Sequence, residues 1–306
     1  MAAPVRTLFF GSGSVALPAL SRLLESRLVE LDSVVTAPAR PAGRKGQLTP
    51  TPVADLASAR DLPVRTPRTL RDEAVLEELR AVGADLIVLA DYGRIIPAAV
   101  LELPRHGALN IHPSLLPRHR GAAPVAGAIL AGDTVTGVTV MRMDEGLDTG
   151  PIVAQSQVPL DGTEVAPELE ARLAELGADL LMEHLPAWLD GTVRERPQPD
   201  EGASLTRLLR REDGRLDPTR PAVELERQVR AYQPWPGSFL EHDGVRLKVW
   251  SAGVLAQEVA VEPGAVILTE GTLGLGTVDG VLRLDEVQPA GKRRMSGAEY
   301  RRGKRL

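Results

Sequence analysis

The sequence contains no cysteine and no apolar run long enough to span a membrane. The absence of cysteine excludes disulfides, thiolate catalysis and thiolate metal sites. A membrane span takes roughly 18 or more consecutive apolar residues, and runs such as Leu86–Ala90 fall far short of this length. The apolar stretch Val5–Phe10 meets Gly11 too early for a signal peptide and is typical of a first strand. We therefore expect an intracellular, cytoplasmic protein.

Histidine is scarce as well, with five residues in 306. None of them pairs with another at the spacing of metal ligands, so we expect no bound metal. The hydrophobic content of 43% and charged content of 25% are ordinary for a globular protein with a sizeable core. The five histidines are His106, His112, His119, His184 and His242.

The net charge of −5 argues weakly against nucleic acid, but the charge is unevenly spread. From Thr206 onwards there are 17 basic and 14 acidic residues, against 19 and 27 before it. The end of the chain is the most basic part, with Lys292 and Arg293 among its cations and Glu299 as its one acid. Such a cluster suits a phosphate-binding surface, although a solvated basic tail explains it equally well.

Apolar runs alternate with helical patterns through the first two thirds of the chain. This alternation predicts an α/β fold with a Rossmann-like, mostly parallel sheet over residues 1–190, whose ligands bind beyond the carboxyl ends of the strands. The expected strands are Val5–Phe10, Leu31–Thr36, Leu86–Ala90, Ala108–Ile111, Gly137–Met141 and Ile152–Val158, and the expected helices are Val15–Glu25, Pro52–Ala59, Asp72–Val82, Ala123–Leu130 and Val165–Leu189.

The pattern changes after Gly191. Residues 191–220 are polar and proline-bearing and are expected to form a linker. In residues 221–306 a short helix, Ala222–Tyr232, precedes about five short strands separated by turn signals, which predicts a small β-barrel of the oligonucleotide-binding (OB) type. The expected strands are Ser238–Glu241, Val245–Ser251, Ala265–Leu268, Leu273–Thr277 and Val281–Val287.

Three polar side chains stand near the ends of predicted strands: Asn110, His112 and Asp148. An amide, an imidazole and a carboxylate suit nucleophilic attack on a carbonyl carbon, because the reaction needs an oxyanion donor and a proton carrier. Each residue alone has a structural explanation, as a cap or a turn residue, and Asp144 competes with Asp148 for the same role. The Pro113–Pro117 segment that follows is expected to be rigid and extended, and its available backbone groups suit binding to the edge of a flat heterocycle.

Two further segments suggest ligands. Gly11-Ser12-Gly13-Ser14-Val15-Ala16 has the form of a dinucleotide fingerprint, so a nicotinamide-dependent oxidoreductase is an alternative. The second strand lacks the acid at its carboxyl end that would hold a ribose, and a tight turn before a helix also explains the glycines. The Pro38–Gly46 segment is a basic loop, either an exposed connector or an arm that carries Arg44 and Lys45 to a phosphate.

Taken together, these features resemble the methionyl-tRNA formyltransferase family, a branch of the folate-dependent formyltransferases. The resemblance covers nearly the whole chain. The set Asn110, His112 and Asp148 marks the reaction class, whereas the basic loop, the Pro-Trp-Pro junction and the C-terminal barrel favour the tRNA-specific branch. The most specific stretches are NIHPSLLPRHRGAAP (110–124), GVTVMRMDEGLDTGP (137–151), RPAGRKG (40–46), RAYQPWPG (230–237) and QPAGKRRMS (288–296).

The resemblance implies transfer of the formyl group of 10-formyltetrahydrofolate to the α-amine of methionyl-initiator tRNA, without a metal. It implies that Asn110, His112 and Asp148 are catalytic and that Ser114, Leu115, Leu116 and Pro117 hold the folate. It implies that Arg44 contacts the tRNA, and we expect Lys45, Lys292 and Arg293 to contact it as well. We also expect the enzyme to be a monomer. Asp91 before Tyr92-Gly93, and Gly11-Ser12-Gly13 in the first turn, depart from the family pattern.

Other function classes remain open at this point. A formyltransferase acting on a sugar amine would use the same three side chains with a different acceptor. A 10-formyltetrahydrofolate hydrolase would release formate, and a non-catalytic RNA-binding module would tolerate loss of all three.

Overall fold

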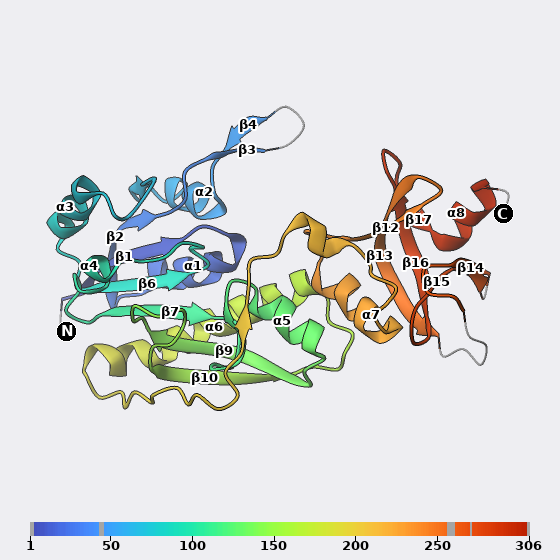
Figure 1. Ribbon diagram of the computed structural model, residues 1–306. Coiled ribbons are helices and arrows are strands. Elements are labelled where there is room, and N and C mark those ends of the chain that lie inside the picture. The colour runs from blue at the N-terminus through green and yellow to red at the C-terminus, as the bar shows by residue number, and fades with distance from the viewer. Residues whose placement is uncertain (1–2, 43–45, 256–260, 270, 305–306) are drawn as a thin grey trace. The chain divides into compact units, whose positions relative to one another are not determined.

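The computed structural model describes residues 3–42, 46–255, 261–269 and 271–304, which divide into two compact units (Figure 1). The first unit comprises residues 1–124, 135–158 and 170–206, and the second comprises residues 125–134, 159–169 and 207–306. Within the described ranges, no helix is long and apolar enough to cross a membrane.

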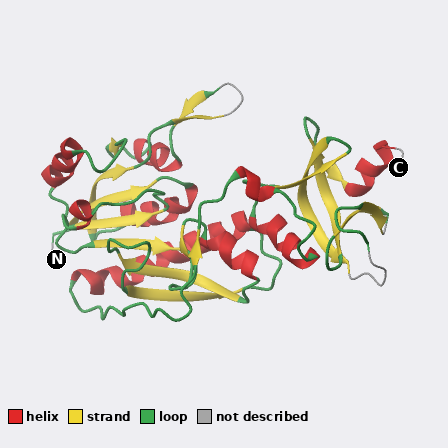
Figure 2. Cartoon of the chain, viewed as in Figure 1, coloured by secondary structure: helices red, strands yellow, loops and turns green. Residues whose placement is uncertain are grey.

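The first unit contains a seven-stranded sheet in the order β10-β9-β7-β6-β1-β2-β5. Figure 1 labels all of these strands except β5, and Figure 2 shows helices beside the strands. Strands β5, β2, β1, β6 and β7 pair in parallel, which confirms the predicted α/β class. All five residues of β6 are buried, as expected for a parallel strand that is covered on both faces. The strands are β1 (Val5–Gly11), β2 (Val29–Val35), β5 (Val64–Arg65), β6 (Leu86–Ala90), β7 (Ala108–His112), β9 (Val135–Arg142) and β10 (Ile152–Pro159).

One strand departs from the expected parallel alternation. Strand β9 runs antiparallel to β7, with His112 opposite Thr139 and Leu109 opposite Arg142. Strand β9 therefore ends beside the start of β7, and not at the edge where β7 ends. The expectation that Asp148 follows a strand end at the same edge as His112 was wrong in this respect.

Most helices before residue 190 follow their sequence signals closely. In α3 (Glu73–Val82), the Asp72 side chain caps the first turn by accepting from the backbone N–H of Ala74 at 3.2 Å, as predicted. Its apolar face, with Leu76 and Leu79, joins the core of the sheet. The other helices described before residue 190 are α1 (Leu17–Glu25), α2 (Pro52–Ser58), α4 (Ala98–Leu101), α5 (Pro124–Ala131) and α6 (Ala166–Leu189), together with the 3-10 turn η1 (Ser14–Ala16). Of these, α4 was not predicted.

Several short elements escaped sequence reasoning. The predicted basic loop, residues 38–46, contains β3 (Arg40–Ala42), which pairs with β4 (Gln47–Thr49) directly after the loop. Residues 43–45 of the loop lie outside the described ranges. The predicted linker contains β11 (Leu205–Thr206), which pairs with β8 (Arg120–Gly121), and the 3-10 turn η2 (Arg211–Gly214). Two-residue strands carry no periodicity that a sequence pattern can detect.

The C-terminal part of the second unit is a curled antiparallel sheet with two helices. The sheet order is β12-β13-β16-β15-β14, with β17 paired to β16. Its core combines the inward side chains Leu247 and Val249 of β13 with Leu225 and Val229 of helix α7. The elements are α7 (Ala222–Ala231), β12 (Ser238–His242), β13 (Val245–Leu255), β14 (Val266–Thr269), β15 (Thr272–Gly276), β16 (Val281–Pro289), β17 (Met295–Ser296) and α8 (Gly297–Lys304).

Candidate active site

Asn110 and His112 lie on β7, the strand that follows β6 in the sheet. Residues two apart on a strand share a face, so both side chains project to the same side of the sheet. Strand β7 is paired on both sides, with Leu89 and Met141 opposite Asn110. This double pairing holds both groups on a rigid element.

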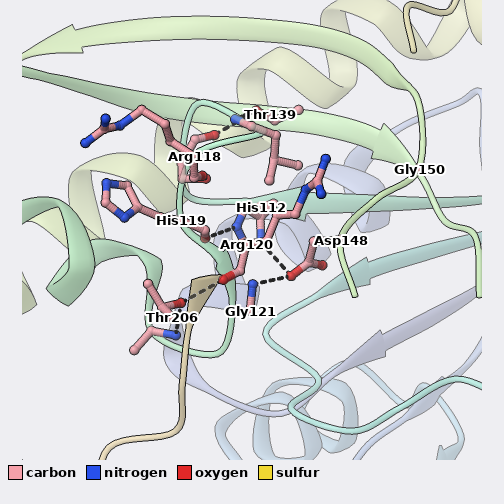
Figure 3. A network of polar contacts seen from close by, with 12 residues as sticks. His112, Arg118, His119, Arg120, Gly121, Thr139, Asp148, Gly150 and Thr206 are labelled. Carbon is pink, nitrogen blue, oxygen red and sulfur yellow. Dashed lines mark hydrogen bonds and ion pairs between the residues drawn. The ribbon is translucent and has the colours of Figure 1, made fainter. Parts of the chain in front are cut away.

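The loop between β9 and β10 brings Asp148 back to His112. Because β9 ends near the start of β7, the loop must return along the sheet to bring the carboxylate within 3.8 Å of His112. Asp148 has φ of 52°, a left-handed conformation that aspartate tolerates better than most residues. Its Oδ2 accepts a hydrogen bond from the backbone N–H of Gly121 at 2.7 Å (Figure 3).

The hydrogen-bond partner of His112 fixes its tautomer. Ring atom Nε2 lies 3.0 Å from the carbonyl oxygen of His119, and a carbonyl only accepts, so Nε2 carries the hydrogen. Atom Nδ1 then faces Asp148 Oδ2 at 3.8 Å, beyond hydrogen-bonding distance (Figure 3). Burial lowers the pKa of His112, and the Asp148 carboxylate partly opposes this effect. His112 is therefore held neutral at pH 7, with Nδ1 as its open position.

The choice between Asp144 and Asp148 follows from the same geometry. The Asp144 carboxylate is exposed and accepts from the hydroxyl of Thr149 at 2.8 Å and the backbone N–H of Gly146 at 3.1 Å. Asp144 thus shapes the loop, while Asp148 reaches the imidazole.

The segment expected to hold folate divides into two kinds of residue. Ser114 and Leu116 are buried, and the Ser114 hydroxyl donates to the carbonyl of Arg118 at 2.7 Å. The N–H of Leu116 donates to Thr139 Oγ1 at 3.1 Å, and its carbonyl accepts from Gln155 at 2.9 Å. The backbone groups of Leu116 are therefore already in use, contrary to the expectation of available backbone groups there. Leu115 and Pro117 remain half-buried.

The glycine-rich first turn has a structural explanation. The backbone N–H groups of Ser12 and Gly13 both point to the carbonyl of Asp91, at 3.0 and 3.4 Å. A dinucleotide pyrophosphate needs such amides free, so the turn is occupied by the chain itself. A Cβ on Gly11 would lie 2.7 Å from Phe9 and 2.9 Å from the carbonyl of Ala90, too close for any other residue. The glycines serve close strand packing, which removes the support for a nicotinamide site.

Asp91 also contributes a carboxyl group to the cavity beside this turn. The cavity has a volume of about 400 Å³ and is lined by Ser12, Arg40, Thr51, Asp91 and Arg94 among others. Desolvation raises the pKa of Asp91 to about 6. Burial raises the pKa of Glu170, and the nearby charge of Asp91 raises it further.

The predicted RNA-contacting residues are only partly described. Arg44 and Lys45 lie outside the described residues. Lys292 and Arg293 are exposed on the turn between β16 and β17, in the second unit. Arg293 also lies 3.6 Å from Glu299.

Comparison with known proteins agrees with this architecture. The family model for formyl transferase matches residues 5–185, and the model for the formyl transferase C-terminal domain matches residues 208–305. The chain belongs to the formyl transferase family. It is 48% identical over 301 residues to the methionyl-tRNA formyltransferase of Chloroflexus aggregans, covering 98% of this chain and 97% of that protein. It is 45% identical over 302 residues to the one of Nitrosococcus oceani, covering 98% and 93%.

Solved structures share the fold of this formyltransferase. HypX from Aquifex aeolicus in complex with tetrahydrofolic acid superposes with a TM-score of 0.63 at 20% identity, over 98% of this chain and 47% of HypX. An N-formyltransferase from Helicobacter canadensis, in complex with folinic acid and dTDP-3-aminofucose, gives a TM-score of 0.68 at 17% identity, over 93% and 99%. The family resemblance predicted from the motifs is confirmed.

Sequence reasoning missed the groups that hold the site of this formyltransferase in place. Gly121 supplies the amide that binds Asp148, and Gln198 donates to the carbonyls of Asp148 and Gly150. Gly121 lies in a stretch that also reads as a solvated loop, and Gln198 lies in the predicted linker. Neither position carries a local signal, because both act through contacts distant in sequence.

Proposed function

We propose that this chain transfers the formyl group of 10-formyltetrahydrofolate to the α-amine of methionyl-initiator tRNA, in support of translation initiation in the cytoplasm. The observation that carries the proposal is the 48% identity, along 98% of the chain, to a relative named methionyl-tRNA formyltransferase. Both family models match, so the similarity is not confined to the catalytic half. We expect the enzyme to act as a monomer and without a metal.

The reaction forms one carbon–nitrogen bond and breaks another. The free amine of the methionyl group attacks the formyl carbon, and negative charge develops on the formyl oxygen. The bond from that carbon to the folate nitrogen then breaks, and a proton moves from the attacking nitrogen to the departing one. The site must therefore stabilise an oxyanion and carry one proton.

We assign proton transfer to His112, acting through Nδ1. Nε2 is committed to the carbonyl of His119, so Nδ1 is the ring atom that can receive a proton from the attacking nitrogen. Once protonated, the ring is a cation 3.8 Å from the Asp148 carboxylate, which favours the charged form. Asp148 thus lowers the energy of the state that burial disfavours.

Asn110 is the proposed donor to the developing oxyanion. Its amide shares a face of β7 with His112, and one well-placed donor contributes about 3 kcal/mol to the transition state. The protonated Nδ1 of His112 supplies a second donor at that stage.

We propose that Leu115 and Pro117 contact the folate, while Ser114 and Leu116 support the segment from beneath. The internal hydrogen bonds of Ser114 and Leu116 hold the backbone, and the half-buried side chains on either side of Leu116 offer apolar surface for a flat ring.

The proposed RNA-binding surface of the second unit surrounds Trp250. The Arg294 guanidinium lies 3.3 Å and the Lys248 ammonium 3.7 Å from the centroid of the Trp250 ring. Lys292 and Arg293 are exposed on the adjoining turn. A cluster of cations around an aromatic ring suits a phosphate backbone with an unpaired base. Arg44 and Lys45 are proposed as a further contact of the same substrate.

A transfer assay tests the proposed function. The purified protein should formylate methionyl-initiator tRNA in the presence of 10-formyltetrahydrofolate, and should leave free methionine and uncharged tRNA unmodified. Equal turnover of an amino sugar would contradict the acceptor, and release of formate without any acceptor would identify a hydrolase.

A further inference from the structure

Gln198 connects three parts of the candidate active site through one side-chain amide. Its Nε2 donates to the carbonyl of Asp148 at 2.8 Å and to the carbonyl of Gly150 at 2.7 Å. Its Oε1 accepts from Arg120 Nε at 3.0 Å. Both amide hydrogens and the oxygen are therefore used, and the partners fix which end of the amide faces which group.

The backbone around Gln198 is itself anchored to the sheet. Arg196 and Ile152 exchange two backbone hydrogen bonds, at 2.8 and 2.9 Å, at the start of β10. This bridge holds the segment beside the loop that carries Asp148. The half-buried Gln198 side chain then reaches across to the loop.

The contacts of Gln198 act on both supports of the Asp148 carboxylate. The bonds to the carbonyls of residues 148 and 150 hold the turn in which Asp148 adopts its positive φ of 52°. The bond to Arg120 holds the first residue of β8. The second residue of β8, Gly121, donates its N–H to Asp148 Oδ2 at 2.7 Å (Figure 3). One amide thus ties the backbone position of Asp148 to the donor that orients its carboxylate.

We propose that Gln198 is a positioning residue that sets the placement of the Asp148 carboxylate relative to Nδ1 of His112. The inference rests on the proposed catalytic roles of His112 and Asp148. Without the amide, two loop carbonyls lose their donor, and the carboxylate shifts away from the imidazole. A displacement of about 1 Å in an active site lowers turnover by about 100-fold.

Two substitutions separate the contacts of Gln198. Gln198→Met keeps the length of the side chain and removes every hydrogen bond. Gln198→Glu keeps an oxygen for Arg120 but turns a second oxygen toward the carbonyls of Asp148 and Gly150. Gln157→Met is the matched control, since Gln157 is exposed on β10. Thermal melting by circular dichroism establishes that each variant is folded.

We expect kcat for formylation of methionyl-tRNA to fall about 10- to 100-fold in Gln198→Met and in Gln198→Glu. KM for the tRNA and for the folate should change by less than about threefold, because neither substrate is expected to touch the residue. Gln157→Met should behave as the unchanged protein. Normal turnover of Gln198→Glu would overturn the proposal, because the loop carbonyls would then need no donor.

A second readout is independent of turnover. NMR titration of the His112 ring, assigned with His112→Gln, should give a lower pKa in Gln198→Met, since the Asp148 carboxylate that raises it has moved away. An unchanged His112 titration would overturn the positioning role, even if kcat falls. If the unchanged protein fails to formylate methionyl-tRNA, the proposed function fails, and the titration still decides the inference on Gln198.

Discussion

His112 donates its Nε2 hydrogen to the backbone carbonyl of His119, with 3.0 Å between nitrogen and oxygen. The two residues are seven positions apart in the chain. The contact leaves a single ring nitrogen for chemistry and aims it at Asp148. The acceptor is a backbone atom, so the contact does not use the imidazole of His119. In the proposed mechanism, the loop that follows β7 thereby determines which ring nitrogen carries the proton.

The carboxylate of Asp148 should matter far more than that of its neighbour in the same loop. Asp148→Asn keeps a residue that tolerates the left-handed backbone but removes the negative charge beside Nδ1. We expect kcat to fall by about 100-fold or more. Asp144→Asn is the control, and a comparable loss there would mean that loop structure rather than charge is being measured.

Acid should destabilise the protein through His112. Burial lowers the pKa of the folded-state imidazole, so the unfolded chain binds its proton first as the pH falls below about 6.5. The stability associated with neutral His112 is present above that pH and is lost as the pH falls toward the folded-state pKa. In His112→Gln, the urea midpoint should therefore fall less between pH 7.5 and 5.5 than in the unchanged protein. His184→Gln should retain the full decrease, and identical decreases in all three proteins would refute the assignment.

Asp91→Asn should stabilise the protein at neutral and higher pH. Burial raises the pKa of Asp91 to about 6, so ionising this carboxyl is harder in the folded protein than in the unfolded chain. The resulting loss of stability is complete above about pH 6 and disappears at low pH, where the carboxyl is protonated in both states. Tm should rise relative to the unchanged protein at pH 8, and the difference should vanish near pH 4. Asp61→Asn controls for the backbone, because Asp61 has a similar positive φ of 55° against 47° for Asp91. An equal gain in both variants would trace the effect to conformation.

Neutralising the cations near Trp250 should weaken tRNA binding in a salt-dependent way. For Lys292→Gln combined with Arg293→Gln, the slope of log affinity against log salt should decrease by about 1 to 2, while folate binding is unchanged. Filter binding at several salt concentrations measures this slope. Arg60→Gln with Arg71→Gln provides a pair of exposed cations from the first unit. A slope unaffected by the first pair would exclude those residues from the RNA contact.

Trp250→Leu tests stacking separately from charge. It removes the ring that both Lys248 and Arg294 contact, and it changes neither of these charged residues. We expect affinity for tRNA to fall by about 1 to 3 kcal/mol with little change in the salt slope. A large change in slope would mean that Trp250 acts by holding the cations.

The longer strands and most helices could be predicted because their signals are local. Strand β6 is apolar throughout, and Asp72 and Gly83 mark the two ends of α3. The direction of β9 carries no such signal, because an apolar run looks the same in either orientation. That direction determines how Asp148 reaches His112, so the sequence anticipated their proximity for an incomplete geometric reason.

The sequence anticipated that His112 and Asp148 lie close together, but it did not reveal the groups that support Asp148. Asn110, His112 and Asp148 stand out because their chemistry is unusual at the ends of apolar runs. Gln198 and Gly121 support Asp148 from 50 and 27 positions away in the chain, and such pairings are set by tertiary packing. Spacing alone also left Asp144 and Asp148 equivalent until the hydrogen bonds of the loop separated them.

The second compact unit includes two segments that precede residue 207 in the chain, residues 125–134 and 159–169. Arg230 of α7, for example, donates to the carbonyl of Glu164 at 2.8 Å. A gene fragment that begins at residue 207 would omit both segments, although the C-terminal family model matches from residue 208. Residues 207–306 expressed alone would therefore lack part of the compact unit to which they belong, including the Glu164 carbonyl that Arg230 contacts.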